Sequence, residues 1–256
     1  MSTTLPFFSI ITASYNSEKT ISDTITSVLN LDFQDFEYIV IDGNSSDNTL
    51  EIIQSFVPKF EAKGVPYKFI SEKDKGIYDA WNKGIQLSSG EWISFLGSDD
   101  MYIEDALINY SNEINKSIIG TNYISSQVEI IDEKHQFIRV IGKPFVWEKV
   151  VRNMNIAQVG SFHKKELFEK VGNFSIVYKI VGDLDFYIRC KDYIQPAFFE
   201  SITAKMQNGG VSNQIYKALK EALIVKLKYG YNSALVNYFD FYFSLLKCYM
   251  KQIIKK

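Results

Sequence analysis

The sequence predicts an α/β fold: a doubly wound, largely parallel sheet with helices on both faces. Strand-like and helix-like segments alternate over about the first 96 residues, as in doubly wound sheets. The strand-like segments are continuous apolar runs, which indicates strands buried on both faces. Polar clusters follow three of these runs, at the carboxyl ends where such sheets bind ligands.

The elements of the first half follow from their patterns. Ile21, Ile25 and Val28 share one helix face, and Ser17 before them is a plausible N-cap. The expected strands are residues 7–13, 36–41, 67–70 and 91–96. The expected helices between them are residues 17–29, 47–60 and 78–87.

The second half continues the same domain with shorter elements. The expected strands are residues 118–124, 128–132 and 137–141, and the expected helices are residues 166–171, 183–191, 212–228 and 232–256. We therefore expect a ligand-binding part at about 1–100, a second part at about 101–211 and a helical tail at 212–256.

Composition excludes several classes of protein. The chain has 256 residues, 46% of them hydrophobic, and a net charge of −2, which excludes disorder. Cys190 and Cys248 are too few for a disulfide scaffold and are expected to be small core residues. The polar start of the chain does not resemble a signal peptide, and no run of 18 apolar residues occurs. We expect a cytoplasmic protein with no membrane-spanning helix and no nucleic-acid partner.

The motifs of several enzyme classes are absent. The sequence contains no G-x-G-x-x-G after the first strand, no P-loop and no G-x-S-x-G. Only two histidines are present, which argues against a His-rich zinc site. Carboxylates at strand ends are the remaining candidates for chemistry.

Asp42, Asp99 and Asp100 are these strand-end acids. Adjacent carboxylates repel one another unless a cation lies between them. A divalent cation prefers oxygen ligands and can bridge to a diphosphate. The residues alone leave two interpretations open, because Ser98, Asp99 and Asp100 are also good N-caps for a following helix.

Six ordered segments resemble the motifs of inverting glycosyltransferases of family 2. They are FFSIITASYN (7–16), EYIVIDGNSSDNT (37–49), SEKDKGIYDAWNKGI (71–85), GEWISFLGSDD (90–100), GSFHKKELFEKVGNF (160–174) and VGDLDFYIR (181–189). The resemblance implies a GT-A fold, in which a nucleotide-binding sheet precedes an acceptor-binding part. The second part at 101–211 would then bind the acceptor.

The resemblance also implies roles for individual residues. The residues placed against the nucleotide are Thr12, Ala13, Tyr15, Asn16, Asp42, Asp79, Asn82, Ser98 and Asp99. Among them, Asp42 would bind the base, usually uracil, and Asp99 the ribose or the sugar. Asp100 would ligate Mn²⁺ or Mg²⁺. Asp183 would be the general base.

Several of these residues have simpler interpretations. Tyr15 can be a packing residue, and Asp79 a surface acid of its helix. Asp185 points to a different helix face from Asp183 and is expected to pair with Arg189 at i+4.

The chain departs from the family pattern before the later strand. Related sequences often have proline and histidine where this chain has Asn155 and Gln158. This region borders the acceptor in the family, so the resemblance does not carry the acceptor's identity over. His163 is displaced from that histidine position and is expected to be structural.

The implied reaction is a single displacement by an acceptor hydroxyl on a nucleotide-sugar, usually a UDP-sugar, giving a β-linkage in cell-surface polysaccharide such as O-antigen or capsule. The acceptor would be a glycan or lipid-linked, and the enzyme a hexosyl- or N-acetylhexosaminyl-transferase. A nucleotidyltransferase would need a Gly-rich basic loop after the first strand, and SYNSEKT is not one. A non-catalytic nucleotide-sugar-binding module would not need the four acids at 42, 99, 100 and 183.

The tail is basic and aromatic. Residues 214–256 contain eight Lys against Glu221 and Asp240, whereas the other residues sum to −8. Polar residues of 232–256 recur at spacings of 3 and 4, beside a wide apolar arc. Such a helix is typical of peripheral contact with an anionic membrane, here the inner face of the cell membrane. The alternative is a helix packed on the catalytic domain or on a second subunit, as in a homo-oligomer.

Overall fold

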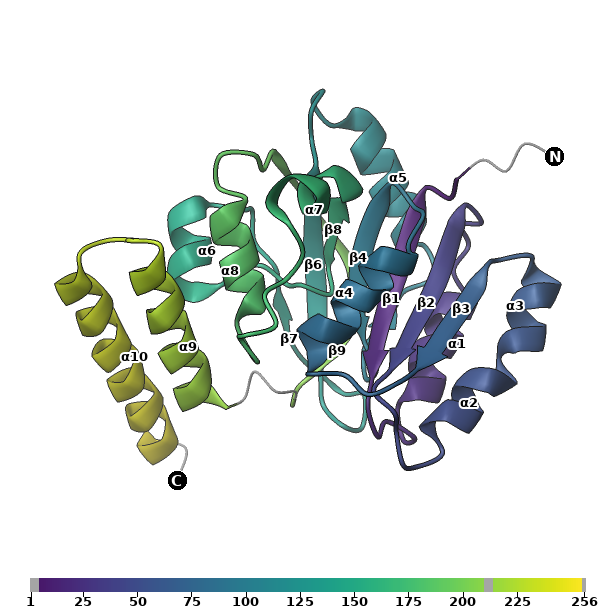
Figure 1. Cartoon of the computed structure of the whole chain (residues 1–256), viewed down its shortest axis with the longest axis horizontal. Helices are drawn as coiled ribbons and strands as arrows, with labels where there is room; N and C mark the ends of the chain where they lie inside the picture. The colour runs from purple at the N-terminus through teal and green to yellow at the C-terminus, as the bar shows by residue number, and fades with distance from the viewer. Residues whose placement is uncertain (1–4, 210–213, 255–256) are drawn as a thin grey trace.

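The described residues of the computed structural model, 5–209 and 214–254, form one nine-stranded sheet with helices on both faces (Figure 1). The strand order is β3-β2-β1-β4-β8-β6-β9-β5, and β7 pairs with β6. The strands are β1 Phe8–Ser14, β2 Phe36–Asp42, β3 Tyr67–Ser71, β4 Trp92–Gly97, β5 Met101–Tyr102, β6 Tyr123–Ile131, β7 Phe137–Ile141, β8 Ser161–Lys164 and β9 Pro196–Gln207. β1 to β4 are mutually parallel, as predicted, and β8 joins β4 in the antiparallel direction.

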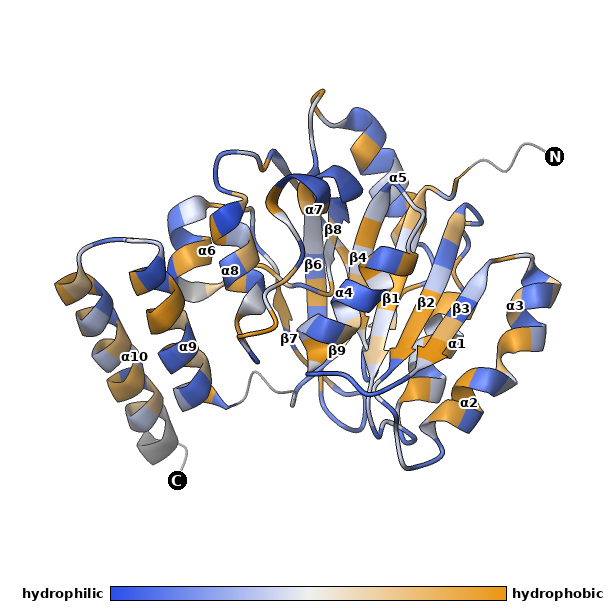
Figure 2. Cartoon of the chain, viewed as in Figure 1, coloured by the Kyte–Doolittle hydropathy of each residue, from blue (hydrophilic) through white to orange (hydrophobic). Residues whose placement is uncertain are grey.

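Helices cover both faces of the sheet. They are α1 Ile21–Leu29, α2 Thr49–Ser55, α3 Val57–Lys63, α4 Ile77–Leu87, α5 Ala106–Lys116, α6 Trp147–Asn153, α7 Lys165–Val171, α8 Gly182–Arg189, α9 Ile215–Lys228 and α10 Ala234–Ile254. α1, α2, α3 and α5 share one core with the sheet, and α4, α6, α7 and α8 share the other. Along β1, Phe8 and Ile10 enter the first core and Ile11 the second. The apolar colour of β1, β2 and β4 in Figure 2 reflects this burial on both faces.

Three predicted elements differ in the structure. α1 begins at Ile21, because residues 17–20 form a turn in which the Thr20 N–H donates to the Ser17 carbonyl, so Ser17 is not its N-cap. The helix expected at 47–60 is divided into α2 and α3, with Pro58, which has no N–H to donate, in the first turn of α3. The strands expected at 118–124 and 128–132 are one strand, β6, preceded by a turn at 118–121.

The tail is a pair of helices beside α6 and α8 (Figure 1). The boundary expected at 211/212 lies outside the described residues, as does residue 212, where the first tail helix was expected to begin. Over the ranges that the structure describes, no helix combines the length and the apolarity needed to cross a bilayer. Cys190 is a core residue, as expected, whereas Cys248 is only half-buried and lies outside the core; both are free thiols.

Candidate active site

The carboxyl ends of the parallel strands bring the predicted loops together. Ser14 is level with Asp42 across β1 and β2, and Asp42 is level with Ser71 across β2 and β3. On the other side of β1, Ala13 is level with Gly97 of β4. The loops after four strands therefore share one edge of the sheet, where ligands bind in α/β folds.

Asp42 lies at the centre of this edge and is completely buried. Its Oδ1 accepts hydrogen bonds from the hydroxyls of Ser45 at 2.5 Å and Ser14 at 3.4 Å. Its Oδ2 accepts from the Ser71 hydroxyl at 2.5 Å and the Ser45 N–H at 3.0 Å. These four donors fill the carboxylate, so Asp42 fixes the loops that follow three strands.

The loops after β1 and β2 are interlocked. Asn16 has a φ of 49°, and its amide oxygen accepts from the Ser46 N–H at 2.9 Å. The Ser17 and Ser98 hydroxyls lie 2.8 Å apart and join the loop after β1 to the loop after β4. Tyr15 remains 65% exposed. An exposed aromatic ring on a fixed loop can stack on a ligand's ring.

Gly43, which has no side chain, allows Asp74 and the Tyr15 ring to approach the loop after β2 closely. A Cβ added at Gly43 would lie 2.6 Å from Asp74 Oδ2 and 3.3 Å from the Tyr15 ring. Asp74 follows β3, so it is a fourth strand-end acid at this edge, which the predicted residues did not include. The signal was present in the sequence, because Asp74 lies in the SEKDKG segment directly after an expected strand.

Asp99 and Asp100 follow β4, with Asp100 buried and Asp99 partly exposed. Asp100 is 7% exposed, with its carboxylate accepting from the N–H groups of Gln207 at 3.0 Å and Gly97 at 3.2 Å. Burial, with the neighbouring Asp99 carboxylate, raises the pKa of Asp100 to about 8. Burial also raises the pKa of Asp99. Asp99 lines a cavity of about 620 Å³ whose wall includes Lys19, Glu133 and His135.

This acidic pair fits a divalent cation. Within residues 5–209 and 214–254, no lysine or arginine forms an ion pair with Asp99 or Asp100, so their charges are unbalanced. Two carboxylates are an incomplete ligand set, and the described residues contain no cluster of three metal-ligating side chains. The remaining ligands would have to come from a bound diphosphate and from water.

Three of the predicted nucleotide contacts are bonded to the protein itself. The Thr12 hydroxyl is buried and accepts from Tyr38 at 3.0 Å. Asp79 accepts from the Lys75 N–H at 2.9 Å and so orders the loop before α4. Asn82 forms two hydrogen bonds with the backbone of Phe174, at 2.8 and 3.0 Å. These residues support the loops around the strand ends, whereas Tyr15, Ser98 and Asp99 retain exposed surface.

Asp183, in the first turn of α8, borders a second cavity of about 600 Å³. Its Oδ1 accepts from the Leu184 N–H at 2.8 Å and lies 3.3 Å from the Tyr78 hydroxyl, which also donates to the Ile180 carbonyl. Within the part of the chain that the structure describes, no donor reaches Oδ2, which is therefore available to a ligand. Burial raises the pKa of Asp183 to about 6, against the opposing hydrogen bonds from Leu184 and Tyr78.

Comparison with known proteins decides the family. The family model described as "Glycosyl transferase family 2" matches residues 9–180. The chain belongs to glycosyl transferase family 2. A "PGL/p-HBAD biosynthesis glycosyltransferase" of Mycobacterium bovis is 30% identical over 218 residues, covering 82% of this chain and 80% of the relative. A "Poly-beta-1,6-N-acetyl-D-glucosamine synthase" of Staphylococcus epidermidis is 38% identical over 99 residues, which cover 38% of this chain and 23% of the relative.

Solved structures show the same GT-A fold. S. aureus TarS 1-349, in complex with UDP-GlcNAc, superimposes with a TM-score of 0.66 at 17% identity, covering 90% of this chain and 69% of that one. A mannosyltransferase of Pyrobaculum calidifontis, in complex with GDP-Man and Mn²⁺, gives a TM-score of 0.67 at 14% identity, covering 90% and 66%. The predicted fold class is thereby confirmed.

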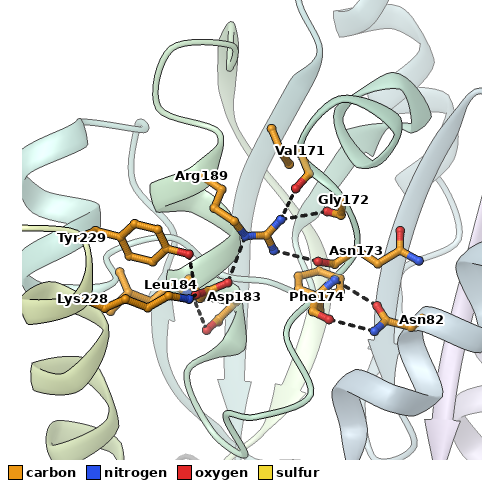
Figure 3. Close-up of polar contacts among 11 residues, drawn as sticks. Asn82, Val171, Gly172, Asn173, Phe174, Asp183, Leu184, Arg189, Lys228 and Tyr229 are labelled. Carbon is orange, nitrogen blue, oxygen red and sulfur yellow. Dashed lines mark hydrogen bonds and ion pairs between the residues drawn. The ribbon is translucent and has the colours of Figure 1, made fainter.

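In this glycosyltransferase, Asp185 is a structural residue. It is 1% exposed, and its Oδ2 accepts from the Arg189 Nε at 3.0 Å, as the i+4 spacing predicted. Its Oδ1 accepts from Lys228 at 3.2 Å and from the Tyr229 hydroxyl at 3.0 Å. Figure 3 shows Arg189 extending from there to the carbonyls of residues 171–173, beside the Asn82–Phe174 pair. Asp185 has no free oxygen to act as a base.

The α9 helix holds the segment that precedes Asp183. The Glu221 carboxylate accepts from the N–H groups of Lys179, Ile180 and Val181 at 2.9 to 3.2 Å. The Lys179 ammonium in turn donates to the Lys75 carbonyl in the loop before α4. The glycosyltransferase thus joins its strand-end loops to its tail through the residues next to Asp183. Sequence pattern does not reveal this contact, because nothing local distinguishes Glu221 from the other charged residues of the helix expected at 212–228.

Gln158, which stands where relatives have histidine, is hydrogen-bonded inside the glycosyltransferase. Its side-chain oxygen accepts from the Tyr187 hydroxyl at 2.9 Å, and His163 Nε2 lies 3.0 Å from the same hydroxyl. His163 is fully buried, and burial lowers its pKa to about 3. His163 is therefore a neutral core residue, as expected.

Proposed function

We propose that this glycosyltransferase moves a sugar from a nucleotide-sugar, a UDP-sugar, to an acceptor hydroxyl with inversion. The observation that carries the proposal is the arrangement of two acidic sites. Asp99 borders one cavity beside the buried Asp100, Asp183 borders another, and the loop before α4 contacts the segment that precedes Asp183. The structural neighbour in complex with UDP-GlcNAc supports the choice of donor.

The donor's base and ribose would lie over the strand-end loops. Tyr15 offers an exposed ring beside Gly43, and Asp74 offers a carboxylate oxygen there. The diphosphate would lie at Ser98 and Asp99, with Asp100 and Asp99 holding Mn²⁺ or Mg²⁺. The cation would neutralise the charge that the leaving diphosphate acquires.

Asp183 would act as the general base from the acceptor side. The hydroxyl proton passes to Asp183 Oδ2 as the acceptor oxygen bonds to the anomeric carbon, and the bond from that carbon to the diphosphate oxygen breaks. One displacement inverts the anomeric centre, so an α-linked donor gives a β-linkage. A pKa of about 6 leaves Asp183 mostly ionised at pH 7 and more basic than an ordinary aspartate.

The relatives that act in PGL/p-HBAD biosynthesis and in poly-beta-1,6-N-acetyl-D-glucosamine synthesis support an acceptor in cell-surface glycan synthesis. We propose a hexosyl- or N-acetylhexosaminyl-transferase that acts in such a pathway. The test is hydrolysis and transfer with a panel of nucleotide-sugars in Mn²⁺ and Mg²⁺. Turnover of one UDP-sugar well above the others supports the proposal, whereas no turnover of any member, in either metal, contradicts it.

Asp42 gives a test of base recognition. Asp42 can bind the base of the nucleotide only if one serine hydroxyl gives up its hydrogen bond to an Asp42 carboxylate oxygen. Under the proposal, Ser45→Ala removes one of these hydrogen bonds, so the variant should bind UDP as tightly as the parent or more tightly. Asp42→Ala should weaken UDP binding at least about tenfold. It should also lower the free energy of unfolding by about 1–3 kcal/mol, because the serine donors lose their acceptor. UDP affinity is measured by calorimetry, and stability is measured by unfolding in denaturant. Unchanged UDP affinity in a folded Asp42→Ala variant would remove Asp42 from the nucleotide site.

We propose further that α10 rests on an anionic membrane surface. Leu235, Phe239, Tyr242, Leu246 and Tyr249 form one stripe, each at least 57% exposed. The opposite face carries Asn237, which is 2% exposed, and Asp240, which pairs with Arg152 at 3.1 Å. A helix that turns its polar stripe inward and its aromatic stripe outward presents a continuous apolar surface to the solvent, which is typical of a contact with a membrane or another protein.

The expected result is that the full chain binds anionic vesicles at low salt and that deletion of 232–256 releases it while nucleotide binding persists. Vesicle flotation measures the first property and UDP calorimetry the second. Neutral vesicles are the control, because weaker binding to them would show that the tail lysines contribute through their charge. A full chain that fails to bind anionic vesicles and sediments as a dimer would assign the stripe to a second copy.

A further inference from the structure

The segment that leads into α8 is held on two sides by helices that are far apart in the sequence. On the tail side, the Glu221 carboxylate of α9 accepts from the N–H groups of three successive residues, 179–181, at 2.9 to 3.2 Å. On the other side, the Tyr78 hydroxyl of α4 donates to the Ile180 carbonyl at 2.8 Å. Ile180 is thus bonded to the tail through its N–H and to α4 through its carbonyl. Asp183 lies three residues further on, in the first turn of α8.

Gly182 connects this segment to Asp183 in close contact with Tyr78. A Cβ added at Gly182 would lie 2.8 Å from two atoms of the Tyr78 ring, so the backbone there rests directly on the ring. The Tyr78 hydroxyl also lies 3.3 Å from Asp183 Oδ1. Because Tyr78 contacts both this backbone and the carboxylate, a shift of the segment would change the position of Asp183.

Glu221 is not needed to hold α9 on the protein. Val225, one turn further along α9, is fully buried and shares an apolar cluster with Tyr178 and Leu184. Within residues 5–209 and 214–254, Glu221 forms no ion pair with a lysine or arginine. Its carboxylate is directed at backbone N–H groups, with which an ionised acceptor forms stronger hydrogen bonds than a neutral one. The consequence of these bonds is a fixed backbone at residues 179–181.

We propose that Glu221 is a positioning residue for the general base: it fixes the backbone before Asp183 and so keeps Asp183 Oδ2 directed at the acceptor. This inference rests on the proposed function, since it assigns Asp183 the role of base. Placement matters because a displacement of about 1 Å, caused by a mutation far from the chemistry, can cost about 10²-fold in rate. Glu221 acts through Asp183 and takes no proton itself.

The first test compares two variants at position 221. The rate measured is the release of UDP from the UDP-sugar that the parent turns over, with water as the acceptor. Glu221→Ala removes the bonds to residues 179–181, so kcat is expected to fall at least about tenfold while the donor KM remains that of the parent. Glu221→Gln keeps an oxygen that accepts hydrogen bonds, so its kcat should lie between those of Glu221→Ala and the parent. Parental kcat in Glu221→Ala would overturn the proposal.

A double-mutant cycle tests whether Glu221 acts through Asp183. If it does, adding Glu221→Ala to Asp183→Asn should slow UDP release by less than about threefold, because the base that Glu221 positions is already absent. An equal loss of rate in the parent and in the Asp183→Asn background would overturn the proposal. Glu221→Gln takes the place of the alanine variant in this cycle if the alanine variant does not fold.

Asp240→Asn is the matched control for the loss of a contact between the tail and the rest of the protein. It breaks the ion pair between Asp240 of α10 and Arg152 of α6, at 3.1 Å, and leaves the bonds of Glu221 in place. Its kcat should equal that of the parent, and thermal unfolding shows whether each variant is folded. A loss of kcat in Asp240→Asn as large as that in Glu221→Ala would overturn a specific role for Glu221.

The same measurements separate this inference from the proposed function. Slow UDP release by Asp183→Asn, together with parental release by Glu221→Ala, would leave Asp183 as the base and overturn the role of Glu221 alone. Parental release by Asp183→Asn would contradict the proposed base, and Glu221 would then lack the residue through which it acts.

Discussion

Replacing Asp183 with asparagine is expected to slow sugar transfer at least about a hundredfold while UDP affinity remains that of the parent. Asparagine keeps the size of the side chain and an oxygen that can accept from the Leu184 N–H, which Asp183 bonds at 2.8 Å. It cannot take a proton from the acceptor hydroxyl. Removal of a general base typically costs about 10²–10⁴ in rate.

The pH dependence provides a second readout of the same residue. Because the base acts when it is ionised and its pKa is about 6, kcat/KM should fall as the pH drops through 6 and level off above it. At pH 5 the rate should be roughly a tenth of the plateau. The Asp183→Asn variant should lose this limb.

The control for Asp183 is its neighbour in the same helix turn. Asp185→Asn disturbs the bonds to Arg189, Lys228 and Tyr229, so it should lower stability and shift activity without removing the acidic limb. Initial rates with saturating donor, together with UDP calorimetry, measure these effects. Near-parental transfer by Asp183→Asn, or an acidic limb that persists in it, would place the base elsewhere.

The sequence predicted the first half of the sheet because each strand there is buried on both faces. Such strands are continuous apolar runs, and the polar residues at their ends identify the ligand-binding edge from the sequence alone. The missed elements, β9 and α5 among them, have mixed patterns. β9 is mostly exposed or half-buried, with two adjacent buried residues and no regular alternation, and it pairs with β6 across many intervening residues, so local pattern did not reveal it.

Individual site residues were harder to predict than the edge on which they lie. The sequence pattern placed Asn82 correctly on its helix. It could not show that the Asn82 side-chain amide bonds the backbone N–H and carbonyl of Phe174, which is remote in the sequence. Glu221 and Lys226 differ from other tail charges only through their tertiary neighbours. Their environments depend on how α9 packs on its neighbouring helices, which helix periodicity does not specify.

Replacing Asp100 with alanine is expected to abolish turnover. The reason is charge. The buried Asp100 and the partly exposed Asp99 lie side by side without a paired cation among the described residues, so they would hold a divalent ion against the donor diphosphate. In the parent, Mn²⁺ should raise the unfolding temperature, since a ligand that binds the folded state stabilises it. In Asp100→Ala this rise should be lost together with activity.

Two controls separate metal binding from folding. Asp100→Ala leaves the N–H groups of Gln207 and Gly97 without their acceptor, which costs about 1–3 kcal/mol for each buried donor. Asp100→Asn keeps an acceptor oxygen with a lower affinity for cations, so it should fold better than the alanine variant and still fail to respond to Mn²⁺. Asp105→Ala removes an exposed acid nearby and should behave as the parent. Full activity of the parent in excess chelator would contradict the metal role of Asp100. The Asp100 carboxyl would then be neutralised by a proton in place of a cation, as its pKa of about 8 permits.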